Sequence, residues 1–167
     1  LIKISESKEE KLFLLEKYLN NITTTVYRQV MFAEFESLTH SKAENGEALT
    51  PDVLCKLYKD VYQKYWGPEM KIDEEESYTW ARVPHFYYNF YVYQYATGFA
   101  ASEALALKVK SEGEPAVQKY LDFLKVGSSD YPINILDKAG VNMNSQEPIL
   151  AVTTKMNQII DEIKNLI

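Results

Sequence analysis

The sequence contains little cysteine or histidine and no long apolar run, and each shortage excludes a class of protein. Cys55 is the single cysteine among 167 residues, so the chain cannot form an internal disulfide bond. No apolar run approaches the roughly 20 residues that a membrane helix needs. The net charge is −6 with acidic and basic residues interspersed, which leaves no basic surface for nucleic acid or anionic lipid. We therefore expect a soluble, cytoplasmic protein that binds neither nucleic acid nor membranes.

The motifs of several catalytic classes are also missing. A zinc site on one helix needs the spacing His-Glu-x-x-His, whereas the two histidines, His40 and His85, fall in different predicted elements. His40 and Glu44 have a helical spacing, but two ligands do not make a metal site, and a solvated helix end is the simpler interpretation. No glycine-rich phosphate loop and no Gly-x-Ser-x-Gly elbow occurs. This chain alone therefore offers no complete catalytic set.

What is present suits one helical domain over residues 1–167. A chain of this size with 46% hydrophobic residues can bury a substantial core. It begins Leu-Ile-Lys-Ile, without an initiator methionine or a signal peptide, so we expect a fragment of a longer protein.

Helical periodicity runs through the whole sequence, and no strand pattern competes with it. Ser5 or Ser7 can cap the first helix, and Thr50 followed by Pro51 is typical of a second helix start. We therefore predict an all-α fold, a multi-helix bundle. The predicted helices cover residues 7–42, 51–66, 87–111, 115–125, 132–139 and 147 onward, with a loop and a short helical turn over 71–84.

The window Arg82–Gly98 has an unusual composition. It contains a histidine, five tyrosines and two phenylalanines. Aromatic rings that carry hydroxyls are costly to bury without partners and are suited to binding a polar chain. We interpret this window as a binding wall.

The segment Ala81–Gly98 closely resembles the part of oligoendopeptidase F that follows its zinc site. That family belongs to the thimet oligopeptidase-like zinc metallopeptidases. Further matching motifs occur in the family's order, so the resemblance spans nearly the entire chain. They are Tyr27–Glu36, Gly113–Val117, Gly127–Pro132 and Lys138–Val141.

The resemblance implies the C-terminal lobe portion of a helical zinc-peptidase fold that cleaves short peptides in a channel between two mostly helical lobes. In the family, the His-Glu-x-x-His helix precedes the part seen here, and we interpret the third zinc ligand, a glutamate, as also lying upstream. Zinc is then a cofactor of the full-length parent and is not bound by this fragment. We expect the isolated fragment to be inactive.

The resemblance also implies roles for residues in the aromatic window. Family enzymes use a histidine and tyrosines from this region to bind substrate and to hydrogen-bond the tetrahedral oxyanion. By position, the matching residues are His85, Tyr88, Tyr91 and Tyr95. We expect His85, Tyr91 and Tyr95 to be catalytic and all four to bind substrate, while the choice between Tyr88 and Tyr91 for the oxyanion stays open.

The spacing of Tyr88, Tyr91 and Tyr95 predicts one stripe on a helix. Without the resemblance, such a stripe is more often core than binding site. Arg82 can pair with a substrate carboxylate, although an ion pair with the acidic run Asp73–Glu76 is the simpler interpretation. The aromatic residues off the stripe are predicted to pack: Phe86, Tyr87, Phe90 and Tyr93.

Two features outside this window also have a plain structural interpretation. Cys55 has apolar neighbours in sequence and is predicted to be an inert buried thiol. The segment Gly127–Pro132 is either a helix-capping turn or a mobile loop that closes over peptide, because its glycine and serines allow both.

Two hypotheses from different classes follow. In the first, the chain is the substrate-binding C-terminal part of a zinc oligopeptidase, and its partners are a short peptide substrate and the upstream zinc-bearing part of the parent. In the second, it is a non-catalytic helical module whose aromatic groove binds a peptide or a partner helix. An excised lobe exposes the surface that normally packs on the missing helices, so we also expect the fragment to form a homodimer.

Overall fold

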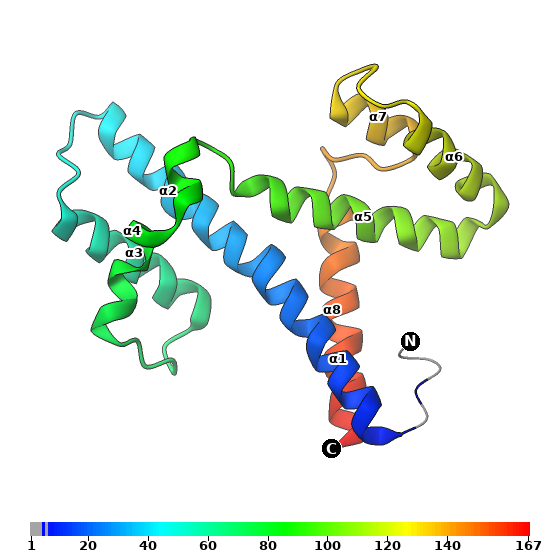
Figure 1. The fold of residues 1–167 in the computed structure, drawn as a ribbon, viewed down its shortest axis with the longest axis horizontal. Helices are drawn as coiled ribbons and strands as arrows, with labels where there is room; N and C mark the ends of the chain where they lie inside the picture. Colours follow the sequence, from blue (N-terminus) through cyan, green and yellow to red (C-terminus); the bar gives the residue numbers. More distant parts are fainter. Residues whose placement is uncertain (1–4, 6) are drawn as a thin grey trace. The chain divides into compact units, whose positions relative to one another are not determined.

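The computed structural model describes residues 5 and 7–167, and every regular element among them is helical (Figure 1). The prediction of an all-α fold is confirmed. The elements, in chain order, are α1 (Lys8–Ile22), η2 (Thr23–Tyr27), α2 (Arg28–Glu44), α3 (Pro51–Trp66), η3 (Glu74–Tyr78), α4 (Thr79–Arg82), η4 (Pro84–Tyr88), α5 (Tyr93–Glu112), α6 (Glu114–Lys125), α7 (Pro132–Lys138) and α8 (Glu147–Leu166).

Internal contacts divide the chain into two compact units. The first contains the described residues up to Val26 together with Thr97–Ile167, and the second contains Tyr27–Ala96. We describe each unit by itself, and the prediction that the whole chain acts as one domain stays a prediction.

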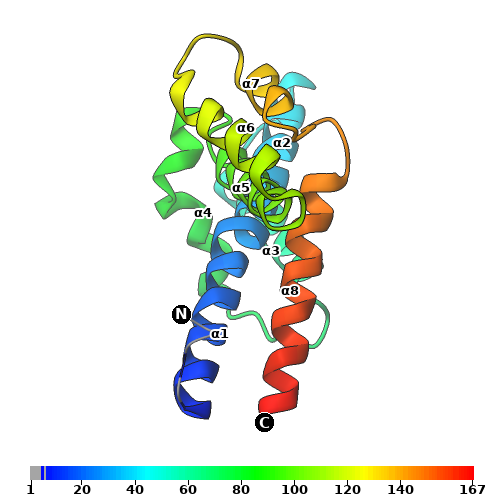
Figure 2. The same cartoon turned by 90° about the vertical axis from the view of Figure 1, so that its right-hand side faces the viewer.

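In the first unit, α1 and α8 pack side by side and run antiparallel (Figures 1 and 2). Leu15 and Ile22 of α1 are buried in one cluster with Val152 and Ile159 of α8 and Ala100 of α5. Full burial of a branched aliphatic side chain stabilises a fold by roughly 1.5–3 kcal/mol. Burial of these side chains therefore stabilises the packing of α1, α5 and α8.

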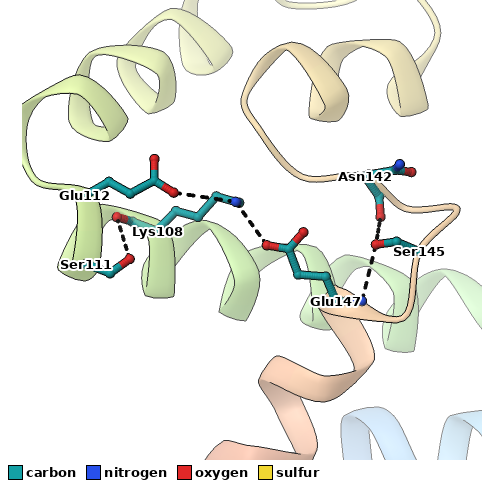
Figure 3. Close-up of polar contacts among 6 residues, drawn as sticks. All are labelled: Lys108, Ser111, Glu112, Asn142, Ser145 and Glu147. Atoms are coloured by element: carbon teal, nitrogen blue, oxygen red, sulfur yellow. Dashed lines mark hydrogen bonds and ion pairs between the residues drawn. The ribbon is translucent and has the colours of Figure 1, made fainter.

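The first turn of α8 is also tied to α5 by charged and polar contacts (Figure 3). Lys108 Nζ lies 3.0 Å from a carboxylate oxygen of Glu147 and 3.6 Å from one of Glu112. Ser145 Oγ accepts a hydrogen bond from the Glu147 N–H at 3.3 Å and donates one to the Asn142 carbonyl at 2.8 Å. The hydrogen bond to Glu147 is the main reason that the pKa of Lys108 is raised.

The turn before α7 is organised by one carboxylate. Asp130 Oδ1 accepts hydrogen bonds from the Tyr131 N–H at 2.8 Å and from Asn134 Nδ2 at 2.9 Å. Asp130 Oδ2 lies 2.7 Å from Lys138 Nζ, at the other end of the same helix. The Lys138 contact first, and then these hydrogen bonds, lower the pKa of Asp130 to about 2. These contacts order the segment before α7, but the N-cap residue Tyr131 makes no side-chain capping hydrogen bond, so both interpretations of Gly127–Pro132 stay predictions.

The segment predicted as one long helix from residue 7 to about residue 42 is not one α-helix. The π turn η2 separates α1 from α2. Here the Thr23 hydroxyl donates to the Leu19 carbonyl at 3.0 Å, and the Thr24 hydroxyl donates to the Asn20 carbonyl at 2.9 Å. Threonine hydroxyls in such contacts compete with the main-chain ladder, and a π turn inserts one residue. Apolar spacing alone does not reveal that insertion.

Two of the predicted N-caps are present. Ser7 Oγ accepts from the Glu10 N–H at 3.0 Å, and Thr50 Oγ1 accepts from the Val53 N–H at 3.4 Å. The helix α3 ends where Gly67 adopts a φ of 82°, a conformation that glycine reaches without steric cost. The predicted bounds of α3 are therefore confirmed.

The second unit is built on α2 and α3, with η3 and α4 packed against α3. Its apolar core is formed by side chains of α2 and α3 and by one residue just before α5. Partly buried aromatic residues, Phe86 among them, pack against this core. The buried members are Met31, Phe32, Phe35, Tyr58, Val61 and Val92.

The predicted start of α5 near residue 87 is wrong, because the helix begins at Tyr93. Residues 84–88 form the separate 3₁₀ turn η4, and the next two residues, Asn89 and Phe90, have φ values of 50° and 53°. A non-glycine residue in this conformation costs on the order of 1–3 kcal/mol and cannot lie inside an α-helix. The helix former pattern of α5 therefore takes effect only after this corner.

Three of the four aromatic residues predicted to pack are instead exposed. The exposed fractions are 66% for Tyr87, 51% for Tyr93 and 51% for Phe90. Phe86 does pack, with its ring centroid 5.3 Å from that of Phe32 and 5.1 Å from that of Phe35. Helical periodicity alone predicts the burial of these side chains wrongly, because η4 and the corner at Asn89 and Phe90 place them elsewhere than a continuous helix would.

Cys55 is half-buried, and its sulfur accepts a hydrogen bond from the Trp80 indole N–H at 3.4 Å. The thiol therefore lies between α3 and α4, and it is less buried than the sequence predicted.

Candidate functional site

Four of the predicted site residues meet in the second unit, and we call His85, Tyr88, Tyr91 and Tyr95 the aromatic cluster. The His85 ring stacks on Tyr91 with a centroid distance of 5.3 Å and an interplanar angle of 13°. Tyr95 meets the edge of His85 at 5.5 Å, and Tyr88 meets it at 6.1 Å. Tyr91 also makes edge contacts with both other tyrosines, at 6.1 Å and 5.7 Å. The rings therefore form one continuous surface.

The cluster does not arise from a helical stripe, and that expectation is corrected. Tyr88 ends η4, Tyr91 precedes α5, and Tyr95 lies in the first turn of α5. The three tyrosines come from three local conformations, and the corner at Asn89 and Phe90 turns the chain so that their rings meet. The four residues named from the family resemblance thus do meet, but through this corner and not as a stripe on one helix.

The cluster is anchored on one side and open on the other. Phe86 and Val92, its immediate sequence neighbours, pack into the core of the second unit, and Val92 is 0% exposed. In contrast, Tyr88 is 63% exposed, Tyr91 40% and Tyr95 36%. The tyrosine hydroxyls therefore belong to rings that a ligand can reach within this unit.

A hydrogen bond joins His85 and Tyr95, two side chains of the cluster that can donate a proton to a ligand. Tyr95 Oη lies 3.0 Å from His85 Nε2, and the histidine tautomer decides which atom donates. If His85 Nε2–H donates to the Tyr95 oxygen, the Tyr95 O–H is free to donate to a third group. Loss of water contact, and then the neighbouring Tyr91 hydroxyl, raise the pKa of Tyr95. The phenol therefore stays protonated, and so remains a donor, at neutral pH.

Arg82 does not join this cluster. It ends α4, and its Nη2 atom lies 3.5 Å from Thr79 Oγ1. It lines a separate pocket together with Asp73, Glu75 and Glu76, so the acidic run is its neighbour. Among the described residues, however, no carboxylate lies within ion-pair distance of its guanidinium.

Sequence reasoning assigned no role to the groups that hold the corner between the two halves of the cluster. Glu36 of α2 is only 3% exposed, and its Oε1 atom accepts a hydrogen bond from the Phe90 N–H at 2.8 Å. His40, interpreted from the sequence as a solvated helix end, places its ring 4.3 Å from that of Phe90. The sequence does contain one signal for a role of Glu36: its carboxylate follows Phe35 directly, on the apolar face of a predicted helix.

A zinc site is not formed by the residues described. Within residues 5 and 7–167, no three His, Cys, Asp or Glu side chains gather closely enough to hold a metal ion. In the same part of the chain, no helix combines the length and the apolar character that crossing a bilayer requires.

Comparison with known proteins places the chain in a family. The family model described as "Peptidase family M3" matches residues 1–154. Oligopeptidase PepF of Bacillus subtilis is 51% identical over 162 residues, which are 97% of this chain and 24% of that protein. The plasmid-encoded oligoendopeptidase F of Lactococcus lactis subsp. cremoris is 44% identical over 167 residues, which are 100% of this chain and 28% of that protein.

Solved structures agree with these sequence relatives. The crystal structure of oligoendopeptidase-F from Enterococcus faecium has a TM-score of 0.95 and 39% identity, covering 99% of this chain and 32% of that one. That of a putative peptidase from Chlamydophila abortus has a TM-score of 0.93 and 43% identity, covering 99% and 28%. The chain thus spans about a quarter to a third of the length of the relatives it matches. The likeness in sequence and fold, over nearly all of its residues, means that the chain belongs to peptidase family M3.

Proposed function

We propose that this chain is the substrate-binding, C-terminal portion of a zinc-dependent oligopeptidase that hydrolyses short peptides. The observation that carries the proposal is the hydrogen bond of 3.0 Å between Tyr95 and His85 within a group of exposed aromatic rings. Relatives named oligopeptidase and oligoendopeptidase, which match 97% and 100% of this chain, support the same reaction. The cytoplasm is the location that we propose for it.

The aromatic cluster provides the chain's contribution to the reaction. When a peptide carbonyl is attacked, negative charge develops on its oxygen, and a donor already directed at that oxygen stabilises the transition state. Tyr95 is the proposed donor. In the proposed tautomer, His85 Nε2–H donates to the Tyr95 oxygen across the 3.0 Å contact, which leaves the Tyr95 proton available to the carbonyl oxygen.

The other two tyrosines hold and extend this donor. Tyr91 stacks on His85 and contacts Tyr95, so it fixes the histidine ring and lies next to the same carbonyl. Tyr88 is the most exposed member of the cluster and contacts the peptide main chain. Arg82 lines its own pocket, where its proposed role is to bind a substrate carboxylate.

Zinc belongs, in this proposal, to the upstream part of the longer peptidase, because the described residues form no metal site. When bound there, zinc supplies an activated water. This chain positions the peptide and donates hydrogen bonds to it. The isolated chain is accordingly proposed to be inactive at any zinc concentration and to form a homodimer.

The proposal is tested by Tyr95→Phe in the full-length peptidase. Removal of one oxyanion donor lowers kcat by roughly 10²- to 10³-fold, whereas KM changes little because the interaction is made mainly in the transition state. His85→Ala lowers kcat in the same sense. The assay is steady-state cleavage of a quenched fluorescent peptide.

Tyr87→Phe is the matched control. Tyr87 lies in the same window and is 66% exposed, but its hydroxyl donates to the Ala81 carbonyl at 3.0 Å. This variant should retain kcat within about twofold. Unchanged kcat in both Tyr95→Phe and His85→Ala would remove the catalytic role and leave the alternative of a non-catalytic peptide-binding module. Zinc-dependent cleavage by the isolated chain would contradict its assignment as the inactive portion.

A further inference from the structure

The two halves of the aromatic cluster are joined by a single corner of the main chain. His85 and Tyr88 precede it, and Tyr91 and Tyr95 follow it. The stack of His85 on Tyr91 and the hydrogen bond of His85 to Tyr95 both cross this corner. Any rotation of the corner therefore changes how the histidine meets the two tyrosines.

The corner has an unfavourable backbone conformation. Asn89 and Phe90 have φ values of 50° and 53°, which non-glycine residues rarely adopt. Asparagine tolerates a positive φ, but phenylalanine has no side-chain group that supports it. Such a conformation persists only where surrounding contacts over-determine it.

One face of α2 contacts this corner. Glu36 accepts a hydrogen bond from the Phe90 N–H at 2.8 Å, although it is only 3% exposed. His40, one helical turn further on, lies against the Phe90 ring with a centroid distance of 4.3 Å and an interplanar angle of 33°. The backbone and the side chain of Phe90 are thus both held by residues separated by four positions on one helix.

We propose that Glu36, assisted by His40, is a positioning residue of the peptidase, and this inference rests on the proposed function of the aromatic cluster. Glu36 does not contact substrate. It fixes the Phe90 amide and thereby sets the distance between His85 and the hydroxyl of Tyr95. A displacement of about 1 Å at a reacting group can lower a rate by about 10²-fold, so a hydrogen bond behind the cluster is sufficient to control turnover.

The test is Glu36→Ala in the full-length peptidase, with Glu36→Gln as the conservative variant. Glu36→Ala should lower kcat by about 10- to 100-fold and leave KM within about threefold. Glu36→Gln should recover most of kcat, because the amide keeps a side-chain oxygen that can accept from the Phe90 N–H. Glu44→Ala, an exposed carboxylate on the same helix, is the control and should retain wild-type kcat.

A double-mutant cycle separates positioning from general loss of stability. If Glu36 acts through Tyr95, then Tyr95→Phe should lower kcat much less in the Glu36→Ala background than in the wild type. If the kcat loss of the double variant equals the product of the losses in Glu36→Ala and Tyr95→Phe, the positioning role is refuted. If Glu36→Ala fails to fold, His40→Ala, at a partly exposed site, replaces it in the same double-mutant cycle. The expected loss in kcat for His40→Ala is about 3- to 10-fold.

The outcomes also separate this inference from the function on which it rests. A large effect of Tyr95→Phe with normal turnover in Glu36→Ala overturns the positioning role and leaves the proposed function intact. No effect of Tyr95→Phe overturns the proposed function itself. Equal kcat losses in Glu36→Ala and Glu36→Gln would show that the acceptor oxygen is not what matters, and would also overturn the inference.

Discussion

Val92 offers a direct test of how the aromatic cluster is anchored. It is 0% exposed, belongs to the core of the second unit, and lies between Tyr91 and Tyr93 in sequence. Val92→Ala removes two methyl groups from a packed site. At about 0.8 kcal/mol per buried carbon group, plus a cavity contribution, the expected loss of local stability is roughly 1.5–3 kcal/mol.

Native-state hydrogen exchange on the full-length peptidase measures this loss where it occurs. Because 1.4 kcal/mol corresponds to a factor of ten, amide protection in α2 and α3 should fall by about 10- to 150-fold. Val126→Ala is the matched control, since Val126 is 37% exposed and lies in the first unit. Protection within twofold of wild type in Val92→Ala, or an equal loss in Val126→Ala, would refute the view that Val92 anchors the cluster.

Two further predictions concern the first unit. The pKa of Asp130 is lowered to about 2 in the folded chain, so its carboxylate stabilises the fold above its unfolded pKa of about 3.8, and this contribution is lost as pH falls toward 2. Asp130→Asn should therefore reduce the unfolding midpoint in urea at pH 7 but have little effect near pH 2. Lys108→Met should lower the free energy of unfolding by about 0.2–1 kcal/mol, because Lys108 bridges Glu147 and Glu112. Lys164→Met, whose ion pair is much more exposed, should leave urea unfolding unchanged.

The fold was predictable from the sequence wherever local signals decide it. Thr50 followed by Pro51 begins α3 and Gly67 ends it, and both act through the backbone of their own neighbours. The turn at Asp130 is likewise decided within one short segment. Local hydrogen bonding of this kind can be recognised without knowledge of any tertiary contact.

The start of α5 was not predictable in this way. Residues 87–92 have no helix breaker in sequence, and the main chain there turns at Asn89 and Phe90, where the Phe90 N–H donates to Glu36. That contact joins residues 54 positions apart. The cluster residues His85, Tyr91 and Tyr95 were found through family resemblance, and the helical spacing offered in their support was wrong in its geometry.

The hydrogen bond between Glu36 and Phe90 limits how far this segment can be moved between proteins. Grafting residues 82–98 into another scaffold would carry every ring of the cluster but not the carboxylate that bends the chain behind them. Without that acceptor, the graft would lack a contact that holds Phe90 at its positive φ, and the bend would relax. A design that is to keep this arrangement must include α2 as well, or must replace Phe90 by glycine, which gives a less constrained bend.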